Sequence, residues 1–535
     1  MEEAQSFLGM AEEKIYDPML LADVNKAIAR IGRAIENGER IIVYGDYDVD
    51  GMTSSALLAL WLRSKGADCE IYIPGRFEEG YGLNCPALDA LKARGTQLVI
   101  TVDCGVTAIT EAEHARSIGL DLVITDHHEC RAEFPKANAI VDPKRPDCRY
   151  PNKHLAGVGV VFKLICAFEG ENKTEEMFDL YGDLVAIGTI SDVMPVVDEN
   201  RELIRRGLRA INSNPRPGIR KLIDEVSPDC TKVTAAIVGF TIAPRLNAAG
   251  RMGQTDMSVN LLMTQDVSEA EMLASELSRL NTERKKLEAE MFEDAISLLP
   301  ETHPEGPIVI ARRGWYQGVT GIVAARIAER FLYPAIIISI DEDGVGRGSC
   351  RSFGSFGIYA ALESCEDILH TFGGHEKAAG VTIAEENIEE LRRRVTKYYR
   401  DKDKTTPAQN LKVDFIVEKP ELLELENIED LELLEPFGHG NPEPILCVTD
   451  AYITAVQSIG AGKHTRIRAE KSGRVFDCVY FSMPIEEIGV KEEMHVDVAF
   501  VPGVNEFRGR RSVQLLIEDI RSAEKNAECG MRNAE

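Results

Sequence analysis

Six aspartates and two adjacent histidines occur at the ends of short apolar segments, and these residues are the best suited to chemistry. Asp46, Asp48 and Asp50 lie in IIVYGDYDVDG, and Asp103 ends LVITVD. The others are Asp126, His127 and His128 in LVITDHHE, and Asp192 in VAIGTISD. Each apolar segment predicts a buried strand followed by a loop. In an open α/β sheet, groups at the carboxyl ends of neighbouring strands converge on one crevice.

Converging carboxylates repel one another unless a cation neutralises them. In an extended segment alternate side chains point the same way, so we expect Asp46, Asp48 and Asp50 to face one cavity. Asp and His ligands without Cys favour Mn²⁺ or Mg²⁺, and imidazole favours Mn²⁺ of the two. A solvated polar turn would explain DYDVDG alone, but the whole set predicts a site for two divalent ions. Two such ions can activate a water and stabilise the attacking and leaving oxygens of a phosphoryl transfer.

The elements that position these residues alternate between strand and helix from about residue 40 to residue 143. RIIVYGD, CEIYIPG, TQLVITVD and LDLVITDHH predict strands. TSSALLALWLRSKG, opened by Thr53 and Ser54 and closed by Gly66, predicts a helix, as do CPALDALKARG and TAITEAEHARSIG. Regular alternation indicates a parallel sheet with helices on both faces. Residues 155–260 are expected to be mostly helical.

Residues 267–299 form one amphipathic pattern that predicts a long helix joining two domains. Its apolar stripe consists of Leu273, Leu277, Leu280, Leu287 and Met291. A coiled-coil dimer is the weaker alternative, because the repeat is short. Residues 306–400 begin a second α/β unit with GPIVIARR, GVTGIVAARIAERF and PAIIISID, and DKDKTTPAQN is a polar linker. From Leu411, several short alternating strands predict a small β-barrel. The expected domains are residues 1–265, 266–300 (the helix), 301–402 and 410–525.

Composition limits the possible function. The formal net charge of −27 argues against a generic nucleic-acid binder, so a polyanionic substrate would need a local basic groove. No apolar run is long enough for a membrane span, and the acidic start MEEAQSFLGMAEEK lacks the order of a signal peptide. The 12 cysteines include no C-x-x-C pair, which favours reduced thiols in a cytoplasm.

The motifs also resemble those of a known family. YGDYDVDG, VDCG, ITDHHE and GTISD are similar to the signature motifs of the DHH phosphoesterase superfamily. RLNAAGRMG (residues 245–253), GRGSCRS (346–352) and FGGHEKAAG (372–380) resemble later motifs of its RecJ exonuclease family, and EPFGHGNPEP (435–444) resembles the entry to that family's OB-fold. The resemblance implies an α/β fold class: a parallel-sheet DHH domain, joined by a long helix to a smaller α/β DHHA1-type domain and followed by a C-terminal β-barrel (OB-fold).

The same resemblance implies roles for the acidic and imidazole residues. Asp48, Asp50, Asp103, His127 and Asp192 would be metal ligands, and Asp46 would be a ligand or lie behind one. His128 would touch the scissile phosphate or hold a ligand in place. Asp126 is expected to orient the histidines, since metal-bound imidazoles usually need a carboxylate behind them. The expected catalytic residues are Asp46, Asp103, His127 and His128. Tyr44 stands where some branches of the superfamily have His, which implies a changed shell for one metal.

Three further clusters offer contacts for a phosphate backbone. Arg245, Asn247 and Arg251 form one, and Arg347, Ser349, Arg351 and Ser352 form another, with Arg suited to bidentate binding. Gly373, Gly374 and His375 would allow a strand to approach the backbone closely. In the barrel, a basic and partly aromatic track could consist of Lys463, His464, Arg466, Arg468, Phe507, Arg508, Arg510 and Arg511. Surface salt bridges, a tight turn and an ordinary mixed-charge surface are the respective alternatives.

These expectations combine into a function. The chain is predicted to be a metal-dependent exonuclease that hydrolyses single-stranded DNA to 5′-mononucleotides in recombination and repair, with Mn²⁺ or Mg²⁺ as cofactor. The 5′→3′ polarity is implied only by the resemblance. A helicase and a single-strand-binding protein are the expected partners, and the chain is expected to be a monomer. One alternative is a phosphodiesterase of cyclic dinucleotides or short oligonucleotides; the other is a non-catalytic single-strand-binding protein.

Overall fold

The protein is described by a computed structural model, which covers residues 7–8, 15–228, 230–299, 306–402, 410–507 and 510–523. The chain divides into two compact units, one of Lys14–Pro407 and one of Ala408–Glu535 with Met1–Glu13. Each unit is described by itself.

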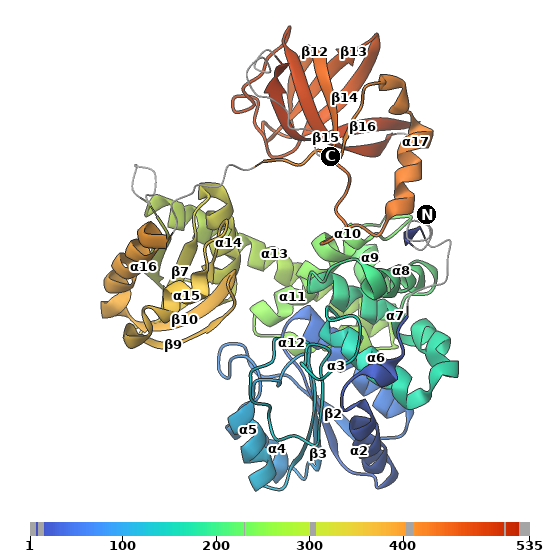
Figure 1. Cartoon of the computed structure of the whole chain (residues 1–535), viewed down its shortest axis with the longest axis vertical. Coiled ribbons are helices and arrows are strands. Elements are labelled where there is room, and N and C mark those ends of the chain that lie inside the picture. Colours follow the sequence, from blue (N-terminus) through green and yellow to red (C-terminus); the bar gives the residue numbers. More distant parts are fainter. Residues whose placement is uncertain are drawn as a thin grey trace. The chain divides into compact units, whose positions relative to one another are not determined.

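The larger unit begins with a parallel sheet whose strand order is β2-β1-β3-β4-β5 (Figure 1). Its strands are β1 (Ile41–Tyr44), β2 (Cys69–Tyr72), β3 (Leu98–Val102), β4 (Asp121–Thr125) and β5 (Ala139–Val141). Tyr44 pairs with Thr101, and Val102 pairs with Thr125. The carboxyl ends of β1, β3 and β4 therefore lie at the same edge of the sheet, and the DYD, VDC and DHH segments all start there.

Helices cover both faces of this sheet, as predicted from the strand and helix alternation. The helices of this part are α2 (Val24–Glu36), α3 (Val49–Ser64), α4 (Cys85–Ala93), α5 (Ile109–Ser117), α6 (Gly157–Glu169), α7 (Thr174–Ser191), α8 (Asp198–Ser213), α9 (Pro217–Val226), α10 (Ala235–Ile237), α11 (Ala243–Arg251) and α12 (Thr255–Met263). Ile42 and Val99 pack with α4 and α5 in one core, whereas Val43 and Ile100 pack with α2, α3 and α6 in the other. Alternation along each strand divides the two cores.

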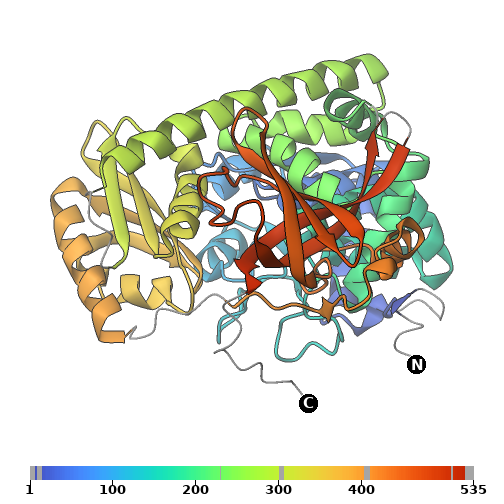
Figure 2. The ribbon, with the colours of Figure 1, turned by 90° about the horizontal axis from the view of Figure 1, so that it is seen from above.

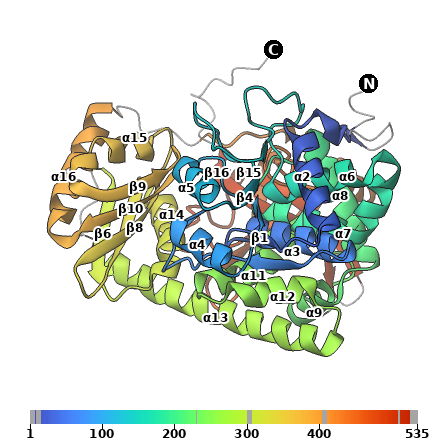
Figure 3. The ribbon, with the colours of Figure 1, turned by 90° about the horizontal axis from the view of Figure 1, so that it is seen from below.

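The predicted long helix is α13 (Val267–Ser297), which is prominent in Figures 2 and 3. Leu273, Leu277 and Leu280 on its first half are buried in the core of the first α/β part. Met291 and Phe292 on its second half are buried in a separate core with the second α/β part. One helix thus belongs to two cores of the same unit.

The second α/β part contains a sheet in the order β6-β7-β8-β10-β9. Its elements are β6 (Ile308–Arg313), α14 (Thr320–Phe331), β7 (Ala335–Ile340), β8 (Val345–Arg351), α15 (Ile358–Glu363), β9 (Leu369–Gly374), β10 (Ala378–Ala384) and α16 (Ile388–Lys402). The two glycine-rich segments form strands, since GRGSCR lies in β8 and FGG and AAG lie in the paired strands β9 and β10. The open face of β8 carries Arg347, Ser349 and Arg351.

The smaller unit is the predicted barrel. Its elements are β11 (Phe415–Ile416), α17 (Leu425–Asp430), β12 (Leu446–Ile459), β13 (His464–Lys471), β14 (Arg474–Tyr480), β15 (His495–Phe507) and β16 (Arg510–Ser522), and pairing of β12 with β15 closes it. Of the predicted track, Lys463 and Arg468 are exposed, His464 lies against Phe481, Arg466 pairs with Asp477 and Arg511 with Glu429. Arg508 and the side chains of Phe507 and Arg510 lie outside the described residues.

Two local predictions are wrong. The helix after β1 begins at Val49 rather than at Thr53, because Asp48 caps its N-terminus by accepting a hydrogen bond from the Gly51 amide. VAIGTIS is the end of helix α7 and not a strand, so Asp192 follows a helix. Short apolar runs do not distinguish a buried strand from a buried helix. Among the described residues, none of the helices combines the length and apolar character that a membrane span requires.

Candidate metal centre and substrate cleft

The structure brings the eight chemistry-bearing residues into two adjacent groups of three and one side pair, Asp126 with His128. Asp46, Asp48 and Asp103 have ligand atoms within 4.8 Å of one another, and so do Asp50, His127 and Asp192. The His127 Nε2 atom lies 3.0 Å from Asp103 Oδ1 and 3.5 Å from Asp192 Oδ2, so it joins the two groups. We call these six residues the acidic cluster.

Local backbone geometry places the acidic cluster. Asp46 lies in the turn after β1, whereas Asp50 is in the first turn of α3 and accepts hydrogen bonds from the Gly157 and Val158 amides. Our expectation that three alternate side chains of an extended segment face one cavity is therefore wrong in its reason, since the chain turns into a helix there. Asp103 adopts a left-handed backbone conformation (φ 60°), a strained state that is common at functional sites.

Glycines allow these elements to approach closely. A Cβ atom on Gly157 would lie 2.8 Å from Asp103 Cβ, and one on Gly188 of α7 would lie 2.4 Å from Thr53 Oγ1 and 3.0 Å from Asp50 Oδ1. Any side chain at either position would push α6 or α7 away from the acidic cluster. This contact explains how Asp192 reaches the cluster although it follows a helix.

The second histidine forms a different arrangement. Asp126 accepts hydrogen bonds from His128 Nδ1 (2.7 Å) and from the amides of Val106, His127 and His128. Burial opposes protonation of His128, but its hydrogen bond to Asp126 prevails and raises its pKa to about 9. The Tyr81 ring lies edge-on to His128, with centroids 5.8 Å apart. Asp126 therefore orients a protonated His128 beside the cluster.

The donor set fits divalent cations. Asp46 Oδ1, Asp103 Oδ1, both ring nitrogens of His127 and Asp192 Oδ2 are buried without a hydrogen-bond partner. Burial, followed by repulsion from Asp48, raises the pKa of Asp46 to about 8 and that of Asp50 to about 7. Burial lowers the pKa of His127 to about 3, which keeps its imidazole neutral and able to bind a metal. Unpartnered oxygens beside a neutral imidazole match the preferences of Mn²⁺ and Mg²⁺.

A cleft of about 1010 Å³ opens beside the acidic cluster. It is lined from the first α/β part by residues including Tyr47, Arg76, Tyr81 and His128, and from the second by residues including Arg347, Ser349, Gly373, Gly374 and His375. Contacts between the Tyr316 hydroxyl and Arg251 O (3.0 Å) and between Arg251 Nη1 and Gly318 O (3.4 Å) join the two parts. The cleft is therefore bounded within one compact unit.

Three arginines near this cleft form no ion pair with a carboxylate of the described residues. Burial, together with the neighbouring Arg76, Arg284 and Arg351, lowers the pKa of Arg251 to about 10. Burial also lowers the pKa of Arg351, and Arg76 adds to the effect. Arg76 stacks on the Tyr47 ring, with Cζ 4.6 Å from its centroid. We call Arg76, Arg251 and Arg351 the arginine group. Because these three positive charges repel one another, a bound anion would stabilise them.

The other predicted substrate-binding residues lie in different places. Arg245 donates to Thr241 O within its own helix, Arg347 pairs with Asp341, and the Ser352 hydroxyl donates to Phe356 O in a turn. Of the predicted substrate-binding residues, Arg245, Asn247, Arg251, Arg351 and Ser352 are not part of the cleft lining. Tyr44 is fully buried, and its hydroxyl donates to Gly82 O.

Sequence reasoning missed Arg76, Tyr81 and Gly380. Ser349, Gly380 and Gly373 are neighbours in register across β8, β10 and β9. A Cβ atom on Gly373 would meet nothing within 4 Å, and one on Gly380 would meet only Gly348 O at 3.9 Å. The fold therefore does not require glycine at either position. The loop PGRFEEGYG, with an arginine and two aromatic residues directly after a strand, was the available signal for Arg76 and Tyr81.

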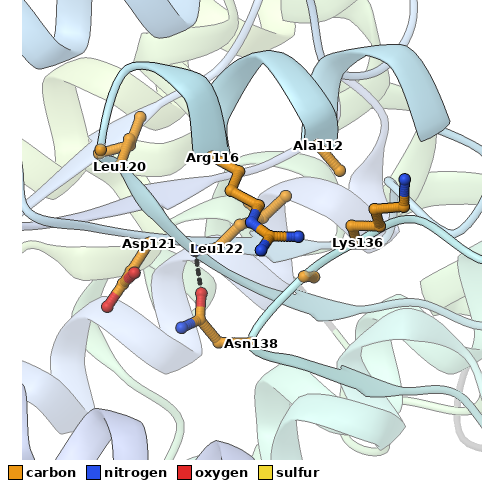
Figure 4. A pocket seen from close by; sticks show the side chains of 9 residues that line it. Ala112, Arg116, Leu120, Asp121, Leu122, Lys136 and Asn138 are labelled. Carbon is orange, nitrogen blue, oxygen red and sulfur yellow. Dashed lines mark hydrogen bonds between the residues drawn. The ribbon is translucent and has the colours of Figure 1, made fainter.

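A second pocket, of about 440 Å³, lies at the start of β4, whereas the DHH segment follows its end (Figure 4). Arg116, Asp121, Lys136 and Asn138 are among its lining residues. Lys136 pairs with Glu113 and Asp121 with Arg30, so most of its charges are already paired. It is separate from the acidic cluster.

Three protein families match the chain along its length. They are the DHH family N-terminal domain at residues 40–189, the DHHA1 domain at 305–401 and the RecJ OB domain at 413–519. The matched ranges agree with the first parallel sheet, the second α/β part and the barrel. The domain limits that we expected from the sequence stay predictions.

Curated relatives match nearly the whole chain. The single-stranded-DNA-specific exonuclease RecJ of Bacillus subtilis is 40% identical over 98% of this chain, which spans 66% of that relative's length. RecJ of Escherichia coli is 36% identical, over 94% of this chain and 90% of its own. The crystal structure of Thermus thermophilus RecJ with Mn²⁺ superposes with a TM-score of 0.82 at 32% identity, covering 94% of this chain and 72% of that one. The chain belongs to the RecJ family of DHH-type single-stranded-DNA-specific exonucleases.

Proposed function

We propose that this protein is a metal-dependent exonuclease that hydrolyses single-stranded DNA in the 5′→3′ direction and releases 5′-mononucleotides. The observation that most supports this function is the acidic cluster, with its buried unpartnered oxygens, beside a cleft that Arg76 lines and that has Arg251 and Arg351 close to Arg76. The acidic cluster is suited to bind cations, and the arginine group is suited to bind an anion. A phosphodiester with its bound divalent ions would satisfy both.

We assign Asp46, Asp48 and Asp103 to one ion and Asp50, His127 and Asp192 to the other, following the two groups of converging ligand atoms. The crystal structures of Thermus thermophilus RecJ were determined with Mn²⁺ and with Mg²⁺, which supports either ion here. When bound, such a pair supplies an activated water and neutralises charge on the attacking and leaving oxygens. Asp103 of one group and His127 of the other lie 3.0 Å apart, so these two residues would link the two ion sites.

The remaining residues act on the substrate directly. Arg76, Arg251 and Arg351 would hold phosphate oxygens, because a guanidinium offers paired donors in a fixed plane. Protonated His128, held by Asp126, would donate to the scissile phosphate. Ser349, whose hydroxyl lies 3.0 Å from the Thr320 hydroxyl, would add a neutral donor on the opposite wall of the cleft. These contacts hold the phosphate in line for attack.

A long single strand fits the rest of the chain. The match to the RecJ OB domain favours a polymer over a cyclic dinucleotide, because OB-folds extend the contact with single strands. We further propose a cytoplasmic monomer that acts in recombination and repair with a helicase and a single-strand-binding protein. The free cysteines at all described positions are consistent with a reducing compartment.

One digestion experiment tests this function. Single strands blocked at the 5′ or the 3′ end, a duplex and a cyclic dinucleotide are incubated with Mn²⁺, Mg²⁺ or a chelator. We expect 5′-mononucleotides from the 3′-blocked single strand only with a divalent ion, and no digestion of the 5′-blocked strand or the duplex. Faster hydrolysis of the cyclic dinucleotide would support the phosphodiesterase alternative. Tight strand binding without hydrolysis in either metal would support the non-catalytic one.

A further inference from the structure

Phe240 is the most exposed large apolar side chain among the described residues, at 86% of its full accessibility. Burial of a phenylalanine side chain in a core stabilises a fold, and Phe240 forgoes that stabilisation. It lies in a π-helix, η3 (Val238–Ile242), between α10 and α11. A π-turn inserts an extra residue into a helix and occurs frequently at functional sites.

Phe240 belongs to a stripe along one helical segment. Within α11, residues 244, 247 and 251 are spaced by three and four, which places Pro244, Asn247 and Arg251 on one face. Phe240 precedes this face by one turn, in the wider π-turn. All four are exposed or half-buried, whereas Ile242, Leu246 and Ala249 on the other side are buried. Arg251 of the arginine group therefore ends a stripe that begins with Phe240, about 16 Å away at 1.5 Å per residue.

Both ends of the stripe touch elements of the acidic cluster. A Cβ atom on Gly250 would lie 2.3 Å from Tyr47 O, between Asp46 and Asp48. A Cβ atom on Gly239 would lie 3.5 Å from Ile190 Cγ2, at the end of the helix that Asp192 follows. The helical segment thus passes along the cluster from the Asp46 group to the Asp192 group, and the stripe lies on the neighbouring, more exposed side of this segment.

Val193, directly after Asp192, provides a second observation. It is 63% exposed and has φ 55°, although left-handed backbone is a strong outlier for a β-branched residue. The Val193 amide donates a hydrogen bond to the carbonyl oxygen of Ile190, the same residue whose side chain faces Gly239. Two exposed apolar residues, Val193 with a strained backbone and Phe240 in a π-turn, therefore lie next to this contact and close in the chain to Asp192.

We propose that Phe240 stacks on a base of the substrate strand a few nucleotides from the bond that is cut, on the part of the strand that stays bound after each cut. The arginine group holds phosphate at one end of the stripe, and an aromatic ring holds a base at the other. Base–aromatic stacking tolerates any sequence and needs an unpaired base, so Phe240 would also select single strands. This inference rests on the proposed function, because it assumes a nucleic-acid strand in the site.

Strand binding tests the inference without catalysis. Affinities for a long single strand and for a dinucleotide are measured in chelator, for wild type, Phe240→Ala and Phe240→Trp, with Met272→Ala as the control. Met272 is also exposed (64%) but lies on α13. We expect Phe240→Ala to weaken binding of the long strand about 10-fold, to leave dinucleotide binding unchanged, and to be rescued by Phe240→Trp. Unchanged melting temperatures would show that the fold is intact.

A fluorescent base analogue, moved along the strand one position at a time, locates the stack. We expect quenching at one internal position in wild type and its loss in Phe240→Ala. Equal binding of the long strand by wild type and Phe240→Ala, or quenching that persists in the variant, would overturn the inference alone. A wild type that binds the strand but never cuts it would overturn the proposed function alone. A concentration-dependent dimer that Phe240→Ala abolishes, with strand binding unchanged, would assign the ring to a second copy and overturn the inference.

Discussion

The acidic cluster and the arginine group both lie near one cleft, and burial shifts the pKa values of their side chains in opposite directions. Burial raises the pKa of Asp46 and of Asp192 to about 8 each, and repulsion from neighbouring carboxylates adds to this effect. Burial lowers the pKa of Arg251 to about 10, and repulsion from neighbouring guanidinium groups adds to this effect. In the protein without ligands, the negative charges of the acidic cluster and the positive charges of the arginine group are therefore both unfavourable.

Other buried charges of the described residues form ion pairs. Lys163 and Glu199 are both almost fully buried and lie 2.8 Å apart, and Arg216 and Asp183 form a similar pair at 2.7 Å. An unpaired buried charge destabilises a fold by several kcal/mol, roughly 3–5 when a partner is removed. The contrast indicates that the acidic cluster and the arginine group are kept unpaired for ligands: cations for the first and phosphate for the second.

Removing one acid of the cluster should have the largest effect. We expect Asp103→Asn to lower kcat on single-stranded DNA on the order of 1,000-fold, because Asp103 lies between both groups of ligand atoms. Steady-state kinetics at saturating Mn²⁺ measure it. Asp89→Asn, on helix α4 away from the cluster, is the matched control. A variant with wild-type kcat would refute the site assignment.

Removing one positive side chain of the arginine group should instead weaken substrate binding. Arg351→Gln should raise KM about 30-fold with a smaller change in kcat, because a buried phosphate partner is lost while the metal ligands remain. Arg393→Gln, whose exposed side chain pairs with Glu390, is the control. A fall in kcat with KM unchanged would mean that Arg351 acts on the transition state. It would contradict our assignment of substrate binding to the arginine group and of metal binding to the acidic cluster.

The glycines of the second α/β part sharpen the comparison. Gly380→Ala should raise KM roughly five-fold without loss of stability, because its Cβ would enter the cleft and meet no packed atom. In contrast, Gly348→Ala should destabilise the protein by about 1–3 kcal/mol, since its Cβ would lie 2.8 Å from Val381 Cγ2. Thermal melts and kinetics on both variants separate the effects. Equal melting temperatures for the two variants would contradict this reading.

Metal-free protein should show the smallest effect, as a pH dependence of stability. The folded pKa values of Asp46 and Asp192 are raised to about 8, so the folded state binds protons that the unfolded state has released. Stability should therefore fall as pH rises toward 8. His128, with a pKa of about 9, acts in the same direction, so rescue by Mn²⁺ isolates the carboxylates. Melting temperatures in chelator that stay level between neutral pH and pH 8 would argue against buried, unpaired acids.

Periodicity and spacing in the sequence predicted four of the five strands of the first sheet, the long helix, the second α/β part and the barrel, because each has a clear apolar pattern; the three-residue strand β5 was missed. They did not identify Asp192 as following a helix, since an apolar run of that length is ambiguous. Arg76, Tyr81 and Gly380 were missed because their role depends on contacts between segments far apart in the chain, such as the pairing of Gly380 with Ser349 and Gly373. Gly373 was predicted only from the resemblance to a family motif.

Direct counting of bound Mn²⁺ tests the central claim, that the acidic cluster holds two divalent ions beside the phosphate site. Equilibrium binding to wild type, Asp192→Asn and Asp103→Asn, followed by electron paramagnetic resonance, measures the number of ions per chain. We predict two ions for wild type, one tightly bound ion for Asp192→Asn and weakened binding of both for Asp103→Asn. Wild-type binding that neither substitution changes would place the ions elsewhere and contradict the account.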